Sequence, residues 1–177
     1  MYDVLKKFFR KRSLKNFASP VQTGILPLRE IRSAVAFIDV EDTSFDACKL
    51  ALQAFFRENG IKGEIFFFDF RKIGSEERLI TSITNTVLKK DLNWYGQPAK
   101  EQVRRMLAVE ADLFLSLIPG TPFPLEYMAK CSRARFKAGR IQLPGDTFDL
   151  VVSDPAGQPL SEKESFDAIC TYFAKIN

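Results

Sequence analysis

Short apolar runs closed by polar or turn-forming residues recur along the whole chain. The runs are 34–40, 65–68, 113–118 and 149–153. Apolar runs of this length are typical of strands that are buried on both faces, as in a parallel sheet. Longer stretches with apolar positions at helical spacing lie between them, so strands and helices are predicted to alternate.

The clearest unit spans 112–140. Its strand, 113–118, ends at a Pro-Gly turn, after which Thr121 can cap a helix that tolerates two prolines in its first turn. We expect that helix over 125–132. Basic and apolar residues alternate from Arg133 and predict another strand. Strand, helix and strand then form one right-handed βαβ unit.

Three further helices are predicted within the α/β pattern. One follows the capping candidates Thr43 and Ser44 and ends near residue 59, and a second covers 99–109 after a proline. The last begins at a capping box, in which Ser161 is followed three positions later by Glu164.

The stretch 73–97 fits two structures. Ile80, Ile83 and Val87 have helical spacing, whereas the threonine-rich composition favours a strand. Both interpretations remain open.

These elements predict a three-layer α/β fold with a mostly parallel open sheet of about five strands, Rossmann-like or flavodoxin-like. We place a single α/β domain at 31–177, a linker at 17–30, and a basic amphipathic helix or tail at 1–16. A chain of 177 residues lies within the size of one domain.

Composition excludes several classes of function. The chain has no histidine, which removes Ser-His-Asp and Cys-His catalysis and histidine metal ligands. Neither GxGxxG nor GxxxxGK[ST] occurs, and we expect no cofactor. Three cysteines without a CxxC pair favour a reducing compartment over a disulfide scaffold. No apolar run is long enough for a transmembrane helix, so we expect a cytoplasmic protein.

Charge is concentrated at the N-terminus. Six basic residues against one acidic residue give 1–16 a net charge of +5, whereas the whole chain carries +4. Apolar residues at helical spacing accompany them, namely Val4, Leu5, Phe8 and Phe9. This segment could bind an anionic membrane surface at the inner face of the membrane, with the cations Lys6, Lys7, Arg10 and Lys11. Alternatively, its apolar residues pack on the body and its basic residues stay solvated, or the segment is a mobile tail. Nucleic acid is not an expected partner.

An acidic cluster follows the first apolar strand. The run Asp39-Val-Glu41-Asp42-Thr43 resembles the aspartate motif of haloacid-dehalogenase-type phosphatases, with Glu41 in place of the second aspartate. Asp146 lies in a stretch similar to the late acidic motif of that family, although the spacing is short by one residue. The resemblance implies Mg²⁺ held by Asp39, Glu41 and Asp146 for phosphoryl transfer. The alternative is that the acids complement the dipole of a helix N-terminus.

Three other features are candidates for binding. Thr121 lies beyond the carboxyl end of a predicted strand, where ligands of α/β proteins bind, although the nearby prolines also favour a rigid turn. Arg133, Arg135 and Lys137 could bind an acidic protein, protect an edge strand from pairing, or mediate self-association. Trp94 could stack on a ligand or plug an edge of the core.

Two resemblances concern larger parts of the chain. Asp112-Leu-Phe-Leu-Ser-Leu, Phe123-Pro-Leu-Glu-Tyr-Met-Ala and Ala134-Arg-Phe-Lys-Ala-Gly139 resemble a strand-helix-strand of heptosyltransferase-type glycosyltransferases. From the basic N-terminus through Lys90-Asp-Leu-Asn-Trp94 to Gly139, the chain more closely resembles a family of short bacterial α/β proteins of unassigned function. The second resemblance implies no catalytic residues.

The leading hypothesis is a non-catalytic binding or interaction module that is peripheral to the membrane through its N-terminal helix. The alternative is a small metal-dependent phosphate or nucleotide-sugar enzyme that uses Asp39 and Glu41.

Overall fold

The protein alternates strands and helices after an N-terminal helix, as the sequence predicts. The structure is a computed structural model, and it describes residues 2–72, 81–82 and 84–176. Its elements are α1 (Tyr2–Phe17), η1 (Leu28–Glu30), β1 (Ser33–Asp39), α2 (Phe45–Glu58), β2 (Lys62–Asp69), β3 (Thr86–Leu88), η2 (Lys89–Asp91), α3 (Glu101–Ala108), β4 (Leu113–Ser116), α4 (Phe123–Cys131), β5 (Phe136–Gly139), β6 (Leu150–Val151) and α5 (Glu162–Phe173).

The described strands form one parallel sheet in the order β3-β2-β1-β4-β5-β6. Ala36 of β1 is in register with Ile65 of β2 on one side and Leu115 of β4 on the other. The prediction of a mostly parallel sheet is confirmed, with one strand more than expected. The strand order is Rossmann-like rather than flavodoxin-like, and it reverses between β1 and β4, where open α/β sheets bind ligands.

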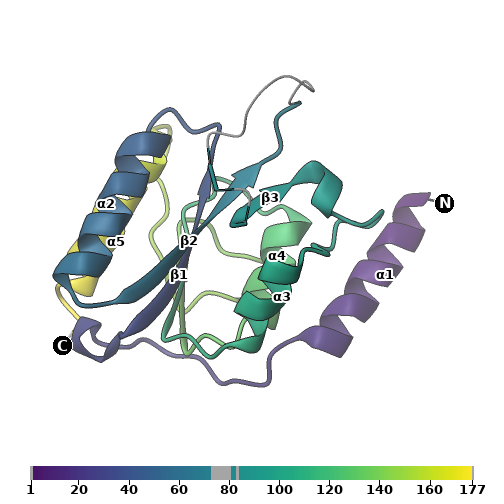
Figure 1. Cartoon of the computed structure of the whole chain (residues 1–177), viewed down its shortest axis with the longest axis horizontal. Helices are drawn as coiled ribbons and strands as arrows, with labels where there is room; N and C mark the ends of the chain where they lie inside the picture. Colours follow the sequence, from purple (N-terminus) through teal and green to yellow (C-terminus); the bar gives the residue numbers. More distant parts are fainter. Residues whose placement is uncertain (1, 73–80, 83, 177) are drawn as a thin grey trace.

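Helices cover both faces of the sheet (Figure 1). Helices α2 and α5 cover one face, α3 and α4 cover the other, and α1 lies outside α3 and α4 as an additional element. Along β1, Ala36 and Ile38 enter the core beneath α2 and α5, whereas Val35 and Phe37 enter the core beneath α3 and α4. Burial on both faces explains the uninterrupted apolar run of this strand.

Aromatic rings fill much of the core on the α3 and α4 side. The ring of Phe37 stacks on those of Phe66 and Phe114, with centroids 5.4 and 4.8 Å apart. At the end of β5, a Cβ atom on Gly139 would lie 2.6 Å from the ring of Phe148. Only glycine therefore allows this ring to pack against the strand.

Local contacts at the helix starts bear on the predicted caps of α5 and α4. The capping box is confirmed, because the Glu164 amide donates to Ser161 Oγ and the Ser161 amide donates to the Glu164 carboxylate at 2.8 Å. Thr121 is not the cap of α4, because the chain stays extended through Pro122 and the helix begins at Phe123. Within 73–97, β3 is a strand, while the positions of Ile80 and Ile83 lie outside the described residues.

Candidate functional site

A hollow of about 480 Å³ opens at the point where the strand order reverses. Its lining comes from the turn after β1, the turn after β4 and the N-terminal end of α5, and it includes Asp39, Glu41, Asp42, Pro119, Ser161 and Glu164. The carboxyl ends of parallel strands meet at one edge of the sheet, which brings these segments together.

The acidic run after β1 orders its own turn. The Glu41 amide donates to Asp39 Oδ1 at 2.8 Å, and Asp42 Oδ1 accepts hydrogen bonds from the Ser44 amide and hydroxyl at 2.8 and 2.7 Å. Burial raises the pKa of the Asp39 carboxyl above its usual range. Asp39 and Asp42 thus contribute to the entry into α2 as well as to the hollow.

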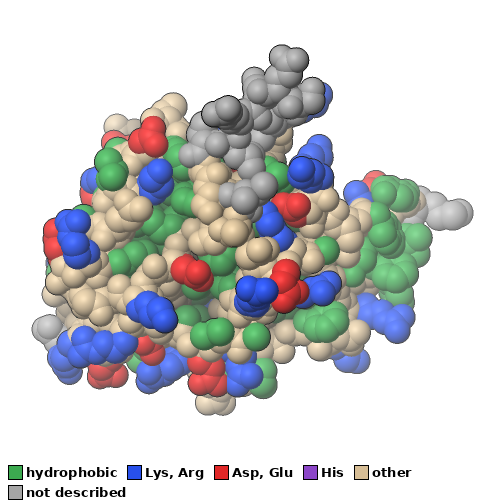
Figure 2. All heavy atoms as spheres, viewed as in Figure 1, with side chains coloured by type: hydrophobic (Ala, Val, Ile, Leu, Met, Phe, Trp, Pro, Cys, Tyr) green, Lys and Arg blue, Asp and Glu red, His purple; other side chains and the backbone are tan. Residues whose placement is uncertain are grey.

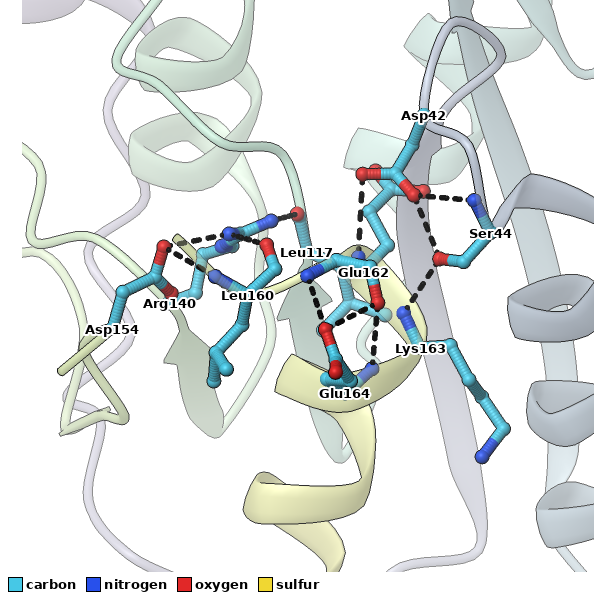
Figure 3. Close-up of polar contacts among 10 residues, drawn as sticks. Asp42, Ser44, Leu117, Arg140, Asp154, Leu160, Glu162, Lys163 and Glu164 are labelled. Atoms are coloured by element: carbon cyan, nitrogen blue, oxygen red, sulfur yellow. Dashed lines mark hydrogen bonds and ion pairs between the residues drawn. The ribbon is translucent and has the colours of Figure 1, made fainter. Parts of the chain in front are cut away.

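Glu162 lies directly behind this acidic run and is completely buried. Its Oε1 accepts a hydrogen bond from the Asp39 amide at 2.6 Å, and its Oε2 has no hydrogen-bond partner among the described residues. Burial, together with the nearby Asp42 and Asp39 carboxylates, raises the pKa of Glu162 to about 9. This shift favours the protonated form of Glu162 at neutral pH. Figure 3 shows its side chain extending from the start of α5 toward Asp42.

Arg140 holds the neighbouring strand ends together. Only 2% of this residue is exposed, and it follows β5 directly. Its Nη2 donates to Asp154 Oδ2 at 2.8 Å and to the Leu160 carbonyl, and its Nη1 donates to the Leu117 carbonyl at 3.4 Å (Figure 3). The guanidinium thus links the ends of β4 and β5 to the segment between β6 and α5.

Sequence reasoning missed the roles of Glu162, Arg140 and Asp154. Glutamate in the first turn of a helix usually faces solvent and complements the helix dipole, so the sequence gives no sign that Glu162 is buried. The sequence does contain a signal for Arg140, because this residue directly follows an apolar strand. A basic residue at the end of a buried strand needs a hydrogen-bond acceptor.

The predicted metal site is only partly assembled. Asp39 and Glu41 line the same hollow, but Asp146 is outside its lining. Within residues 2–72, 81–82 and 84–176, no three Cys, Asp or Glu side chains lie together in an arrangement that could hold a metal ion. The donor set therefore does not fit a bound Mg²⁺. Thr121 is exposed and also lies outside the lining of the hollow.

The basic residues near β5 do not form one surface. Lys137 is only 5% exposed, because α4 covers it, and its Nζ donates to the Ala129 carbonyl at 2.6 Å. Burial lowers the pKa of Lys137. Arg133 and Arg135 are exposed, but they form ion pairs with Glu110 at 2.6 Å and Asp112 at 3.1 Å. A partner surface of all three residues is therefore excluded.

The position of β5 also corrects the edge-strand interpretation. This strand pairs with β4 on one side and with β6 on the other. Its backbone groups are thus used within the sheet, so the basic residues do not protect an edge and β5 cannot mediate self-association through an open edge.

Trp94 packs against the N-terminal helix. Its ring meets that of Phe9 edge to face at 5.1 Å and that of Tyr2 at 6.0 Å, although Trp94 remains 45% exposed. The loop that contains Trp94 also receives a hydrogen bond from Arg10 Nε to the Tyr95 carbonyl at 2.6 Å. Trp94 therefore contributes aromatic contacts between this loop and α1.

The inner face of α1 comprises Phe9, Arg10 and Ser13. The Arg10 guanidinium lies over the ring of Phe123 at 4.6 Å, and Ser13 Oγ donates to Gln97 Oε1 at 3.0 Å. Arg10 is thus bound to the body and does not belong to a surface available for anions, contrary to its predicted role.

The outer face of α1 points away from the body. Its apolar members are Val4, Leu5 and Phe8, which are 71%, 49% and 58% exposed. Its basic members, Lys7, Lys11, Arg12 and Lys15, are exposed as well. Figure 2 shows hydrophobic and basic side chains together over this helix. Lys6 is half-buried, with its ammonium 5.0 Å from the ring centre of Tyr2.

Comparisons with known proteins place the chain in a family but supply no activity. No match was found among curated proteins or among solved structures, so the resemblance to heptosyltransferase-type enzymes gains no support. In the described part of the chain, no helix has the length and apolar character required to cross a membrane. One family model matches residues 3–168, which is most of the chain. The chain thus belongs to this family, described as a family of unknown function (DUF6913).

Proposed function

We propose that this protein is a non-catalytic binding module that docks on the anionic inner surface of a membrane through the outer face of α1. The observation that carries the proposal is the exposure of Val4, Leu5 and Phe8 among basic residues on a helix whose opposite face is fixed to the body. Phe9, Arg10 and Ser13 on the opposite face contact the body, which leaves the residues of the outer face for a membrane surface.

The spacing of the outer face suits an interface between water and lipid. Val4 and Phe8 are one helical turn apart, so they lie on the same side of α1. Lys11 and Lys15 continue that side, and long basic side chains can extend their charges to lipid head groups while their stems stay in the apolar layer. The body holds α1 in place, so this face is presented without further rearrangement.

Both contributions to binding are of useful size. A Lys or Arg near an anionic membrane surface contributes about 1 kcal/mol, and burial of a large apolar side chain contributes about 1.5–3 kcal/mol. Four cations and the ring of Phe8 therefore support reversible association rather than permanent anchoring. Because salt screens the charged part, binding should weaken as ionic strength rises.

Vesicle sedimentation tests the proposal. We expect the protein to pellet with vesicles that contain phosphatidylserine and to remain in solution with pure phosphatidylcholine vesicles. The double variant Lys11→Glu/Lys15→Glu and the variant Phe8→Ser should each lose most of this binding. The matched control, Lys62→Glu/Lys175→Glu, makes the same change in charge at exposed lysines outside α1 and should bind normally. Negligible binding of the natural protein, or equal binding by both double variants, would refute the proposal.

A second candidate function is the small phosphate or nucleotide-sugar enzyme based on Asp39 and Glu41. The observation that favours it is that both carboxylates line the hollow at the reversal of strand order. A rise in melting temperature with Mg²⁺, together with hydrolysis of p-nitrophenyl phosphate that Asp39→Asn abolishes, would support it. Because no three carboxylates among the described residues are arranged to hold a metal ion, we instead expect no response to Mg²⁺ and no turnover, and that result would remove this candidate.

A further inference from the structure

A second hollow, of about 500 Å³, lies between the end of α1, α3 and α4. Its volume is within the usual range for sites that bind small molecules. The floor is made by Val103 and Leu107 of α3 and by Tyr127 and Cys131 of α4. Three of these residues are buried and Leu107 is half-buried, whereas the rim carries the exposed ring of Phe17.

The floor offers apolar surface and few free polar groups. The Tyr127 hydroxyl accepts a hydrogen bond from Gln97 Nε2 at 2.9 Å, and Gln97 Oε1 accepts from Ser13 Oγ and from the Tyr95 hydroxyl. Burial raises the pKa of Cys131 to about 11, so its thiol is uncharged at neutral pH. Polar groups that are already satisfied gain little from a polar ligand, so this floor suits a hydrocarbon chain.

The rim is positively charged. Arg104 and Arg133 line it, and no Asp or Glu is among the described residues that line the hollow. Arg104 is exposed, and none of the ion pairs formed by the described residues includes it. The pair between Arg133 and Glu110 is exposed on both sides, and such pairs contribute little. Both guanidinium groups can therefore turn to a carboxylate at the rim.

From the apolar floor and the basic rim together, we infer that this hollow binds a single-chain amphipathic carboxylate, such as a free fatty acid. The acyl chain lies on Val103, Leu107 and Tyr127, and the carboxylate pairs with Arg104 at the rim. This site is separate from the outer face of α1, so it goes beyond the proposed membrane docking and does not depend on it.

Calorimetric titration with dodecanoate, below its micelle concentration, tests the inference. We expect one dodecanoate per chain, and no binding of dodecyltrimethylammonium, which has the same chain and the opposite charge. Arg104→Gln should weaken dodecanoate binding about tenfold, the size of one charge-assisted contact. Arg105→Gln is the matched control, because Arg105 lies next in α3, is exposed and does not line this hollow.

Filling the hollow supplies a second test. Leu107→Trp should abolish dodecanoate binding. Ala108→Trp should abolish it as well, and because residue 108 is exposed at the rim, a large side chain there leaves the core intact. No dodecanoate binding by the natural protein, equal losses in Arg104→Gln and Arg105→Gln, or normal binding by Ala108→Trp would each overturn the inference. Dodecanoate binding that persists in Lys11→Glu/Lys15→Glu supports the inference. It would also show that the hollow binds its ligand independently of membrane docking.

Discussion

The buried carboxyl group of Glu162 should make the stability of this protein depend on pH in a way that one substitution removes. Glu162→Gln keeps the size of the side chain and an oxygen that can accept the hydrogen bond from the Asp39 amide. It removes the only proton that this position can gain or lose. The effect of the charge can therefore be measured with little change in packing.

The sign and size follow from the raised pKa. The folded protein holds the proton of Glu162 up to about pH 9. An exposed glutamate in the unfolded chain releases it near pH 4.3. The stability that Glu162 contributes is thus fully present below about pH 4.3 and is lost as the pH rises toward about 9, with a slope of about 1.4 kcal/mol per pH unit. From pH 5 to 8 the natural protein should lose about 4 kcal/mol relative to Glu162→Gln.

Urea unfolding at pH 5, 6, 7 and 8, followed by far-UV circular dichroism, measures this difference. The useful quantity is the change with pH in the gap between the two free energies of unfolding, because a constant packing cost of the substitution cancels. Glu164→Gln is the control, since Glu164 is exposed in the same helical turn and its hydrogen bonds with Ser161 lower its pKa. Parallel pH profiles for the natural protein and Glu162→Gln would refute the reasoning.

Three further substitutions test the packing around the sites. Arg140→Met should lower the free energy of unfolding by about 3–5 kcal/mol, because it removes the buried guanidinium that pairs with Asp154 and donates to two carbonyl groups; a loss below about 1 kcal/mol in urea unfolding would contradict this role. Gly139→Ala should cost about 1–3 kcal/mol through the contact with Phe148, whereas Gly24→Ala, which has open space, should change stability little, and equal effects would argue against the contact. Arg10→Ala should loosen α1 and shift the emission of Trp94 to the red, with Arg12→Ala as the exposed control; an unchanged spectrum would show that Arg10 does not hold the helix.

The sequence determined the kind and order of the elements because their signals are local. The apolar runs at 34–40 and 113–118 became β1 and β4, since a strand covered on both faces needs apolar side chains on both. The capping box of Ser161 and Glu164 likewise fixed the start of α5 through contacts within a single turn.

Side-chain alternation alone did not decide which side of a strand is covered. Alternation with a period of two residues placed Lys137 on the same side of the strand as Arg133 and Arg135. However, α4 lies over that part of β5 and buries the Lys137 side chain. The same holds for α1. Phe8 and Phe9 are both apolar at helical spacing, and only the position of the Trp94 loop determines that Phe9 packs and Phe8 is exposed.

The candidate site depends on the tertiary structure even more. Asp39 and Glu162 are 123 positions apart in sequence, and they meet because the sheet places the end of β1 beside the start of α5. Burial then turns an ordinary first-turn glutamate into a protonated side chain. Hydrophobic pattern and capping are encoded within one or two turns of chain, whereas burial and charge at a site depend on neighbours that only the folded chain brings together.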